Sequence, residues 1–224
     1  MTWVKICGMT NLEDALVAVE AGADAVGFVF YEKSPRCVSV EKARAIVEKL
    51  PQKVTTVGVF VGAKAEAVGD ASMQAGLTAA QIYPRAPNAL NEEFMKKIPC
   101  RIIPAVSAEE VGENELVGFQ VSTEAQGRVM AFLLDSGNKE SPGGTGLKFD
   151  WKGWGNMAEL ASSVPLKVVV AGGLTPENVS EAIGILKPWG VDVVSGVEAC
   201  PGKKDPEKVR AFVRAVREAD RKAL

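Results

Sequence analysis

Short apolar segments alternate with amphipathic segments along the whole chain. Eight runs rich in Val, Ile, Ala and Phe predict β-strands over residues 3–8, 25–31, 55–61, 79–83, 101–106, 129–135, 167–172 and 191–197. Helical periodicity follows these runs, beginning near Asn11, Val40, Lys64, Asn91, Ala108, Trp151, Pro176 and Asp205. This strict alternation is typical of parallel strands joined by right-handed crossovers.

The number of repeated units indicates how the sheet closes. Eight β-α units within 224 residues fit a closed barrel, a fold that typically takes roughly 250 residues. The strand segments are almost continuously apolar, as expected when both faces of a strand are covered. We therefore predict an α/β fold, a single (β/α)8 TIM barrel with parallel strands, in which residues 1–224 form one domain.

Charge and hydropathy exclude two classes of partner. The formal net charge of −2 gives no electrostatic footprint for nucleic acid or for an anionic membrane surface. No apolar run approaches the ~20 residues that a membrane-spanning helix needs. The first residues carry no basic region followed by an apolar stretch, so no secretion signal is predicted. We expect a cytoplasmic protein without a nucleic-acid or membrane partner.

The chain contains no histidine, which excludes several kinds of site. A Ser-His-Asp or Cys-His catalytic set and a His-ligated metal are impossible. Cys7, Cys37, Cys100 and Cys200 are far apart and none belongs to a C-x-x-C pair, so we expect free thiols and no metal site. Proton transfer must therefore use carboxylates, Cys, Lys, Tyr or water.

In this fold the active site lies at the C-terminal ends of the strands. Lys5 and Cys7 share one face of the first strand, because side chains alternate along a strand, and this polar pair is expected to face the barrel interior. Cys7 suits a reactive thiol and a small buried apolar residue equally well. For Lys5, an ion pair that stabilises this end of the barrel is favoured over a Schiff-base lysine.

Two charged residues follow strands directly. Asp135 comes after the buried run Phe132-Leu133-Leu134, and we favour a functional carboxylate there over one that caps a loop. Arg36 follows the second strand, where it is either a solvated surface charge or a bidentate ligand for a carboxylate.

Glycine-rich turns follow the last three strands. They are found in residues 141–146, 171–174 and 194–196. Glycine lets the backbone approach a ligand closely, and N–H groups at helix starts bind anions without a basic side chain. Because the last loops of such barrels often bind phosphate, we predict a phosphate site formed by these turns.

The ordered set of these motifs resembles the phosphoribosylanthranilate isomerases, enzymes of tryptophan biosynthesis. The matching segments are Lys5-Ile6-Cys7-Gly8, Gly27-Phe28-Val29-Phe30, Ser34-Pro35-Arg36, Leu133-Leu134-Asp135, Gly143-Gly144-Thr145-Gly146, Phe149-Asp150-Trp151, Ala171-Gly172-Gly173-Leu174, Gly190-Val191-Asp192, Ser195-Gly196-Val197-Glu198 and Pro201-Gly202. They span nearly the whole chain in the order of the family.

The resemblance implies a (β/α)8 barrel that uses neither cofactor nor metal. It implies an Amadori rearrangement of N-(5′-phosphoribosyl)anthranilate, a small phosphorylated substrate, to 1-(2-carboxyphenylamino)-1-deoxyribulose 5-phosphate. Cys7 is then the general base at C2′, Asp135 the general acid at the ribose ring oxygen, and Arg36 the ligand of the anthranilate carboxylate. The residues implied to bind the phosphate are Gly144, Gly146, Gly172, Gly173, Ser195 and Gly196. We expect a monomer or a homodimer.

One segment departs from the family. After the fourth strand the family usually has Gln-Leu-His-Gly, whereas this chain has Gln81-Ile82-Tyr83-Pro84. Pro84 restricts Tyr83 to extended conformations and removes an N–H, so this loop must leave its strand differently.

Two alternative functions remain open on the sequence. One is the sugar isomerase of histidine biosynthesis, which would be expected to use a carboxylate base on the first strand; Cys7 argues against it. The other is a catalytically impaired barrel that only binds phosphorylated ligands, which the altered fourth loop motivates.

Overall fold

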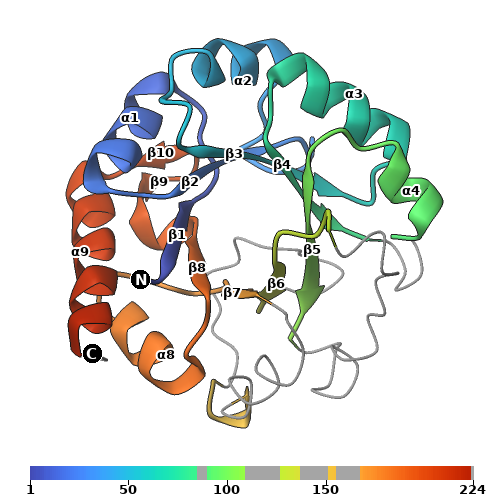
Figure 1. Ribbon diagram of the computed structural model, residues 1–224. Helices are drawn as coiled ribbons and strands as arrows, with labels where there is room; N and C mark the ends of the chain where they lie inside the picture. Colours follow the sequence, from blue (N-terminus) through green and yellow to red (C-terminus); the bar gives the residue numbers. More distant parts are fainter. Residues whose placement is uncertain (85–89, 109–126, 137–150, 155–166, 223–224) are drawn as a thin grey trace.

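Eight parallel strands close into a barrel in the computed structural model, which describes residues 1–84, 90–108, 127–136, 151–154 and 167–222 (Figure 1). Each strand pairs with the next, and the eighth pairs with the first through Trp3–Gly190 to Ile6–Val193. The strands are β1 (Trp3–Ile6), β2 (Ala25–Val29), β3 (Thr55–Val61), β4 (Ala79–Tyr83), β5 (Arg101–Ser107), β6 (Phe132–Asp135), β7 (Val168–Val170) and β8 (Gly190–Val193). The predicted TIM barrel is confirmed.

Helices surround the barrel (Figure 1). Those described are α1 (Leu12–Ala21), α2 (Val40–Val47), α3 (Ala65–Ala75), α4 (Glu92–Lys96), α8 (Val179–Leu186) and α9 (Pro206–Lys222), with short 3-10 helices η2 (Trp151–Trp154) and η3 (Ser195–Val197). The helix predicted from Ala108 falls mostly in residues 109–126, outside the described part. Of the helix predicted from Trp151, only the first turn, η2, is described.

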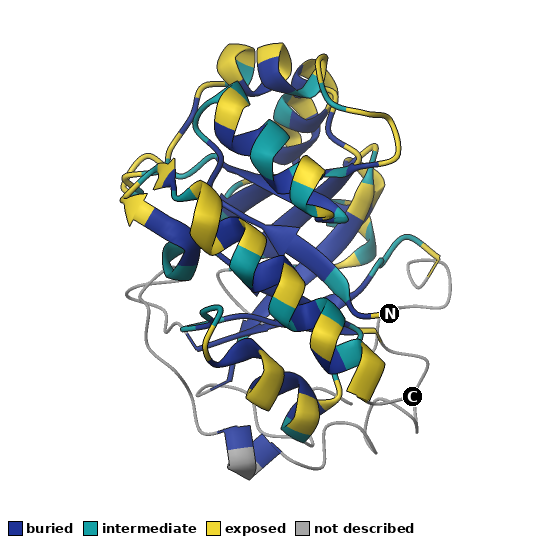
Figure 2. Cartoon of the chain, turned by 90° about the vertical axis from the view of Figure 1, so that its left-hand side faces the viewer, coloured by how far each residue is buried: buried dark blue, intermediate teal, exposed yellow. Residues whose placement is uncertain are grey.

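Local chemistry explains where several helices begin and which face they bury. The Asn11 side chain accepts a hydrogen bond from the Asp14 N–H (2.8 Å), and Asp205 accepts one from the Glu207 N–H (2.9 Å), so both residues cap helices. The apolar stripe of α9 is buried against its neighbours α1 and α8. Figure 2 shows the outcome, with buried residues in the strands and exposed ones on the outer helix faces. No helix among the described residues is long and apolar enough to cross a membrane.

Several predicted boundaries differ from the structure by up to four residues, and two of them, after β8 and before α8, differ for the same physical reason. The strand predicted to Val197 ends at Val193, because the backbone at Val194 leaves the extended region (φ −121°, ψ −84°) and enters η3. The helix predicted from Pro176 begins at Val179. There the Asn178 side chain accepts from the Thr175 N–H and donates to the Gly173 carbonyl, each at 2.9 Å. In both cases the chain forms a turn at the barrel mouth before regular structure resumes.

The barrel interior is layered. Its apolar part includes Ala25, Val57, Ile103 and Leu133. Lys5, on the neighbouring strand beside Ala25, is completely buried within the barrel. A smaller group of Cys7, Val29 and Val59 packs separately. The interior is thus filled, which leaves the C-terminal rim as the place for a ligand.

Candidate active site

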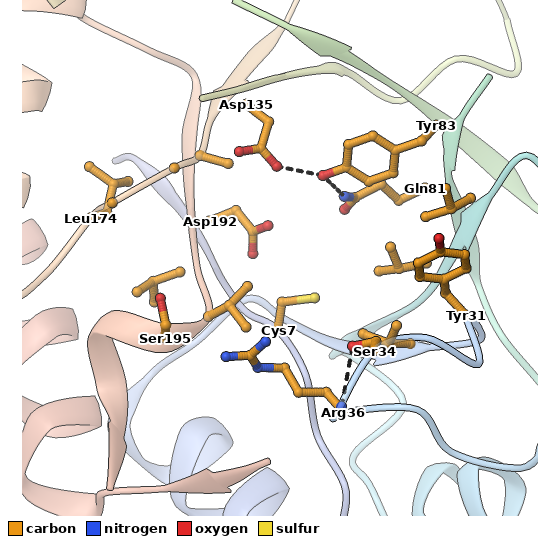
Figure 3. A pocket seen from close by; sticks show the side chains of 18 residues that line it. Cys7, Tyr31, Ser34, Arg36, Gln81, Tyr83, Asp135, Leu174, Asp192 and Ser195 are labelled. Carbon is orange, nitrogen blue, oxygen red and sulfur yellow. Dashed lines mark hydrogen bonds between the residues drawn. The ribbon is translucent and has the colours of Figure 1, made fainter. Parts of the chain in front are cut away.

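A pocket lies at the C-terminal ends of the strands (Figure 3). Six of the nine residues predicted for the site line it together: Cys7, Arg36, Asp135, Gly172, Gly173 and Ser195. Gly196 follows Ser195 directly in η3. Gly144 and Gly146 lie outside the described residues. The barrel thus brings residues more than a hundred positions apart in the sequence, such as Cys7 and Asp135, into one pocket.

Cys7 lies at the floor of this pocket. It follows β1, its N–H donates to the Val193 carbonyl (2.9 Å), and its side chain is only 3% exposed. Burial raises the pKa of the Cys7 thiol, although the positive charge of Lys5 acts in the opposite direction. The thiol is therefore the dominant form at neutral pH in the unliganded protein.

An ion pair supports Cys7 from within the barrel. Lys5 Nζ lies 2.8 Å from Asp192 Oδ2 and also donates to Gln81 Oε1 at 2.8 Å. Burial alone would lower the pKa of Lys5, but the nearby Asp192 and Cys7 raise it, so the ammonium keeps its proton. The interpretation of Lys5 as an ion-paired residue is confirmed.

Asp135 ends β6 and is 3% exposed. The Tyr83 hydroxyl donates to Asp135 Oδ2 at 2.6 Å, and Gln81 Nε2 lies 3.2 Å from the same phenol oxygen. Burial and the negative charge of Asp135 raise the pKa of Tyr83 well above its ordinary value, so the phenol acts as a donor. A line of hydrogen bonds thus runs across the barrel mouth from Lys5 through Gln81 and Tyr83 to Asp135.

Arg36 is not a solvated surface charge. Its Nε and Nη2 donate to the two carboxylate oxygens of Glu198 at 2.9 and 2.7 Å, and Lys204 Nζ lies 3.1 Å from Glu198 Oε1. Burial alone would raise the pKa of Glu198, but Arg36 and Lys204 outweigh it and lower that pKa. The guanidinium is therefore fixed at the pocket by a protein carboxylate, which leaves its Nη1–Nη2 edge for another ligand.

The two described glycine turns pack against each other. Gly172 has a positive φ of 90°, and a Cβ at this position would collide with Ser136. A Cβ on Gly196 would overlap the Leu174 carbonyl oxygen. Close backbone approach therefore requires glycine at both positions, and it brings the β7 turn and Ser195 to the same side of the pocket.

Gln81, Asp192 and Glu198 belong to this site, although no role for them was predicted from the sequence. Gln81 and Tyr83 share one face of β4 by the period-two rule, and Asp192 interrupts an apolar strand. Those two signals identify polar residues inside the barrel. Glu198 had no comparable signal, because its partner Arg36 lies 162 residues away.

Comparison with known proteins identifies the family. The family model for N-(5′-phosphoribosyl)anthranilate (PRA) isomerase matches residues 4–215. The curated N-(5′-phosphoribosyl)anthranilate isomerase of Geotalea uraniireducens is 42% identical over 214 residues, which are 96% of this chain and 98% of that protein.

Solved structures show the same barrel. Phosphoribosyl anthranilate isomerase from Thermotoga maritima is 40% identical, with a TM-score of 0.80, over 97% of this chain and 100% of that one. A phosphoribosyl anthranilate isomerase in complex with reduced 1-(o-carboxyphenylamino)-1-deoxyribulose 5-phosphate is 39% identical, with a TM-score of 0.77 and the same coverage. From sequence match, barrel and pocket together, the chain belongs to the N-(5′-phosphoribosyl)anthranilate isomerase family.

Proposed function

We propose that Cys7 is the general base and Asp135 the general acid of this chain's reaction. The chain is an N-(5′-phosphoribosyl)anthranilate isomerase of tryptophan biosynthesis, which turns an aminoaldose phosphate into an aminoketose phosphate. The observation that carries the assignment is that Cys7, after β1, and Asp135, at the end of β6, line one pocket. A chain without histidine needs two other groups for its two proton transfers.

The proposed reaction has two proton transfers with the protein, one from Asp135 and one to Cys7. Asp135 gives its proton to the ribose ring oxygen while the bond from that oxygen to C1′ breaks, and the amine nitrogen forms a protonated imine. The Cys7 thiolate then takes the proton from C2′, which gives an enolamine. Tautomerisation moves the proton of the C2′ hydroxyl to C1′ and yields the ketone. The protein is left with a thiol and a carboxylate, which exchange with solvent restores.

The two sides of the pocket suit the two ends of the substrate. In Figure 3, Leu174 and Ser195 lie on one side and Tyr31 on the other, with Cys7 between them. The phosphate is placed at the glycine turns, where backbone N–H groups can bind it. The aromatic ring then lies toward Tyr31, and the reacting carbons lie over the thiol.

A further acceptor faces this pocket. Asp192 lines it and is 4% exposed, and its Oδ1 has no hydrogen-bond partner among the described residues. A buried carboxylate oxygen of this kind suits a ribose hydroxyl, because the hydroxyl would satisfy it without adding charge.

Arg36→Ala is expected to raise KM by about tenfold or more while kcat falls much less, because a carboxylate ligand acts in ground and transition states alike. Steady-state kinetics on the variant measure both constants. Arg44→Ala, which removes an exposed arginine paired with Glu48 on α2, is the control and should leave KM unchanged. An unaltered KM for Arg36→Ala would show that Arg36 does not hold the substrate.

The pH dependence of kcat/KM should show a basic limb above 9.0, the ordinary value for a thiol, because burial raises the pKa of Cys7. The reaction needs a thiolate together with a protonated carboxyl. The fraction of Cys7 thiolate keeps growing with pH until the thiol has titrated, so a loss of activity at high pH is expected only beyond that point. A basic limb below 9.0, or thiolate absorbance from Cys7 at neutral pH, would contradict this.

The activity is tested by following the fluorescence of N-(5′-phosphoribosyl)anthranilate as the purified chain consumes it. Loss of fluorescence in proportion to enzyme concentration is expected. Binding without turnover would instead support a barrel that only binds phosphorylated ligands. The cytoplasmic location, the absence of a nucleic-acid partner and the monomeric or homodimeric state stay predictions.

A further inference from the structure

We propose that Tyr83 is a positioning residue for Asp135, whose phenol hydroxyl stabilises the carboxylate that forms when Asp135 gives up its proton. This inference rests on the proposed acid role of Asp135.

The contact has the geometry of a hydrogen bond to a charged acceptor. The Tyr83 hydroxyl lies 2.6 Å from Asp135 Oδ2, within the range of ~2.5–2.7 Å typical of O–H···O⁻ bonds. Both residues end strands that point into the same pocket, β4 and β6. Figure 3 shows the phenol and the carboxylate directed toward each other above Asp192.

The phenol is held from a second direction. Gln81 Nε2 lies 3.2 Å from the Tyr83 oxygen, and Lys5 Nζ in turn holds Gln81 Oε1 at 2.8 Å. Lys5 fixes which end of the Gln81 amide faces the phenol, since an ammonium only donates. The Tyr83 oxygen therefore accepts from Gln81 and must direct its proton to Asp135.

The backbone fixes Tyr83 as well. It pairs with Val61 of β3, and its carbonyl accepts the Gly62 N–H at 2.9 Å. Pro84 restricts the residue before it to extended backbone. Tyr83 and Pro84 thus act together to hold a phenol beside the acid.

This arrangement favours the transition state of ring opening. As the proton leaves Asp135 for the ring oxygen, negative charge grows on the carboxylate while Tyr83 keeps its own proton. A hydrogen bond to a developing charge strengthens during the step, and such differential binding raises kcat. The phenol also holds Asp135 Oδ2 in a fixed place, which orients the carboxyl group for transfer.

Tyr83→Phe tests the proposal because it removes the hydroxyl and keeps the ring. We expect kcat to fall by about tenfold or more, the usual effect of losing a hydrogen bond to a charged group, with KM within about twofold of the parent. Circular dichroism should match the parent and confirm the fold. An unchanged kcat would overturn the proposal.

A double-mutant cycle separates this role from a packing role. In the Asp135→Asn background no carboxylate forms, so adding Tyr83→Phe should lower the residual kcat by less than about twofold. The same loss in both backgrounds would overturn the proposal, because a packing effect does not depend on the charge at 135. If Asp135→Asn alone leaves kcat unchanged, it is the assignment of the acid that fails.

Discussion

Cys7→Ala and Asp135→Asn are each expected to lower kcat by about 10²- to 10⁴-fold, the usual contribution of a positioned base or acid. Alanine removes the only thiol that lines the described pocket. Asparagine keeps the shape of the carboxyl group but has no acidic proton to give. Steady-state kinetics at saturating substrate measure the effect, with circular dichroism to confirm folding.

Matched controls come from the surface of the same chain. Cys200→Ala removes an exposed thiol on β9 (Glu198–Cys200), and Asp70→Asn removes an exposed carboxylate on α3. Both should keep the kcat of the parent. A folded Cys7→Ala variant with near-parental kcat would remove the thiol from the mechanism, and the same result for Asp135→Asn would remove the acid.

Lys5→Met is expected to reduce the free energy of unfolding by about 3–5 kcal/mol, the usual loss when one partner of a buried ion pair is removed. Lys5 is 0% and Asp192 4% exposed, so the substitution leaves a buried carboxylate without its cation. Because a domain is typically stable by only ~5–15 kcal/mol, this is a large part of the total. Chemical denaturation, analysed as a two-state transition, measures the change.

The double variant Lys5→Met/Asp192→Leu should recover much of this loss, since it removes both charges together. Arg44→Met is the comparison. Arg44 also forms an ion pair with a carboxylate, that of Glu48 at 2.7 Å, but both of these side chains are more than half exposed. Arg44→Met should change stability far less. If Lys5→Met were as mild as Arg44→Met, the buried pair would not stabilise the barrel.

Much of the fold follows from local pattern. The predicted strands 55–61 and 79–83 match β3 and β4 in the structure, because strands covered on both faces are largely apolar and Gly62 and Pro84 follow them directly. Position at the C-terminal ends of strands also made Asp135 a candidate and left two interpretations of Cys7 open, and both residues line the pocket. In a barrel of this kind, a residue at the C-terminal end of any strand lies at the same end of the barrel, where the active site is.

The partners of these residues could not be predicted in the same way. Lys5 meets Asp192 across 187 positions and Arg36 meets Glu198 across 162, and only closure of the barrel brings such pairs together. The short hairpin of β9 and β10 (Lys203–Lys204), which carries Glu198 and Lys204, has too few residues for a periodic signal. The hydrogen bond from Tyr83 to Asp135 likewise joins two strands 52 residues apart.

The central claim is that Asp135 acts in ring opening and Cys7 in proton removal at C2′. The most direct test compares the kcat of the double variant Cys7→Ala/Asp135→Asn with the kcat of each single variant. Ring opening and proton removal at C2′ are consecutive steps, so the slower step alone sets the rate. We therefore expect the double variant to lie within about tenfold of the slower single variant. A kcat reduced by the product of the two single effects would mean that both groups act in one transition state, and would contradict the two-step assignment.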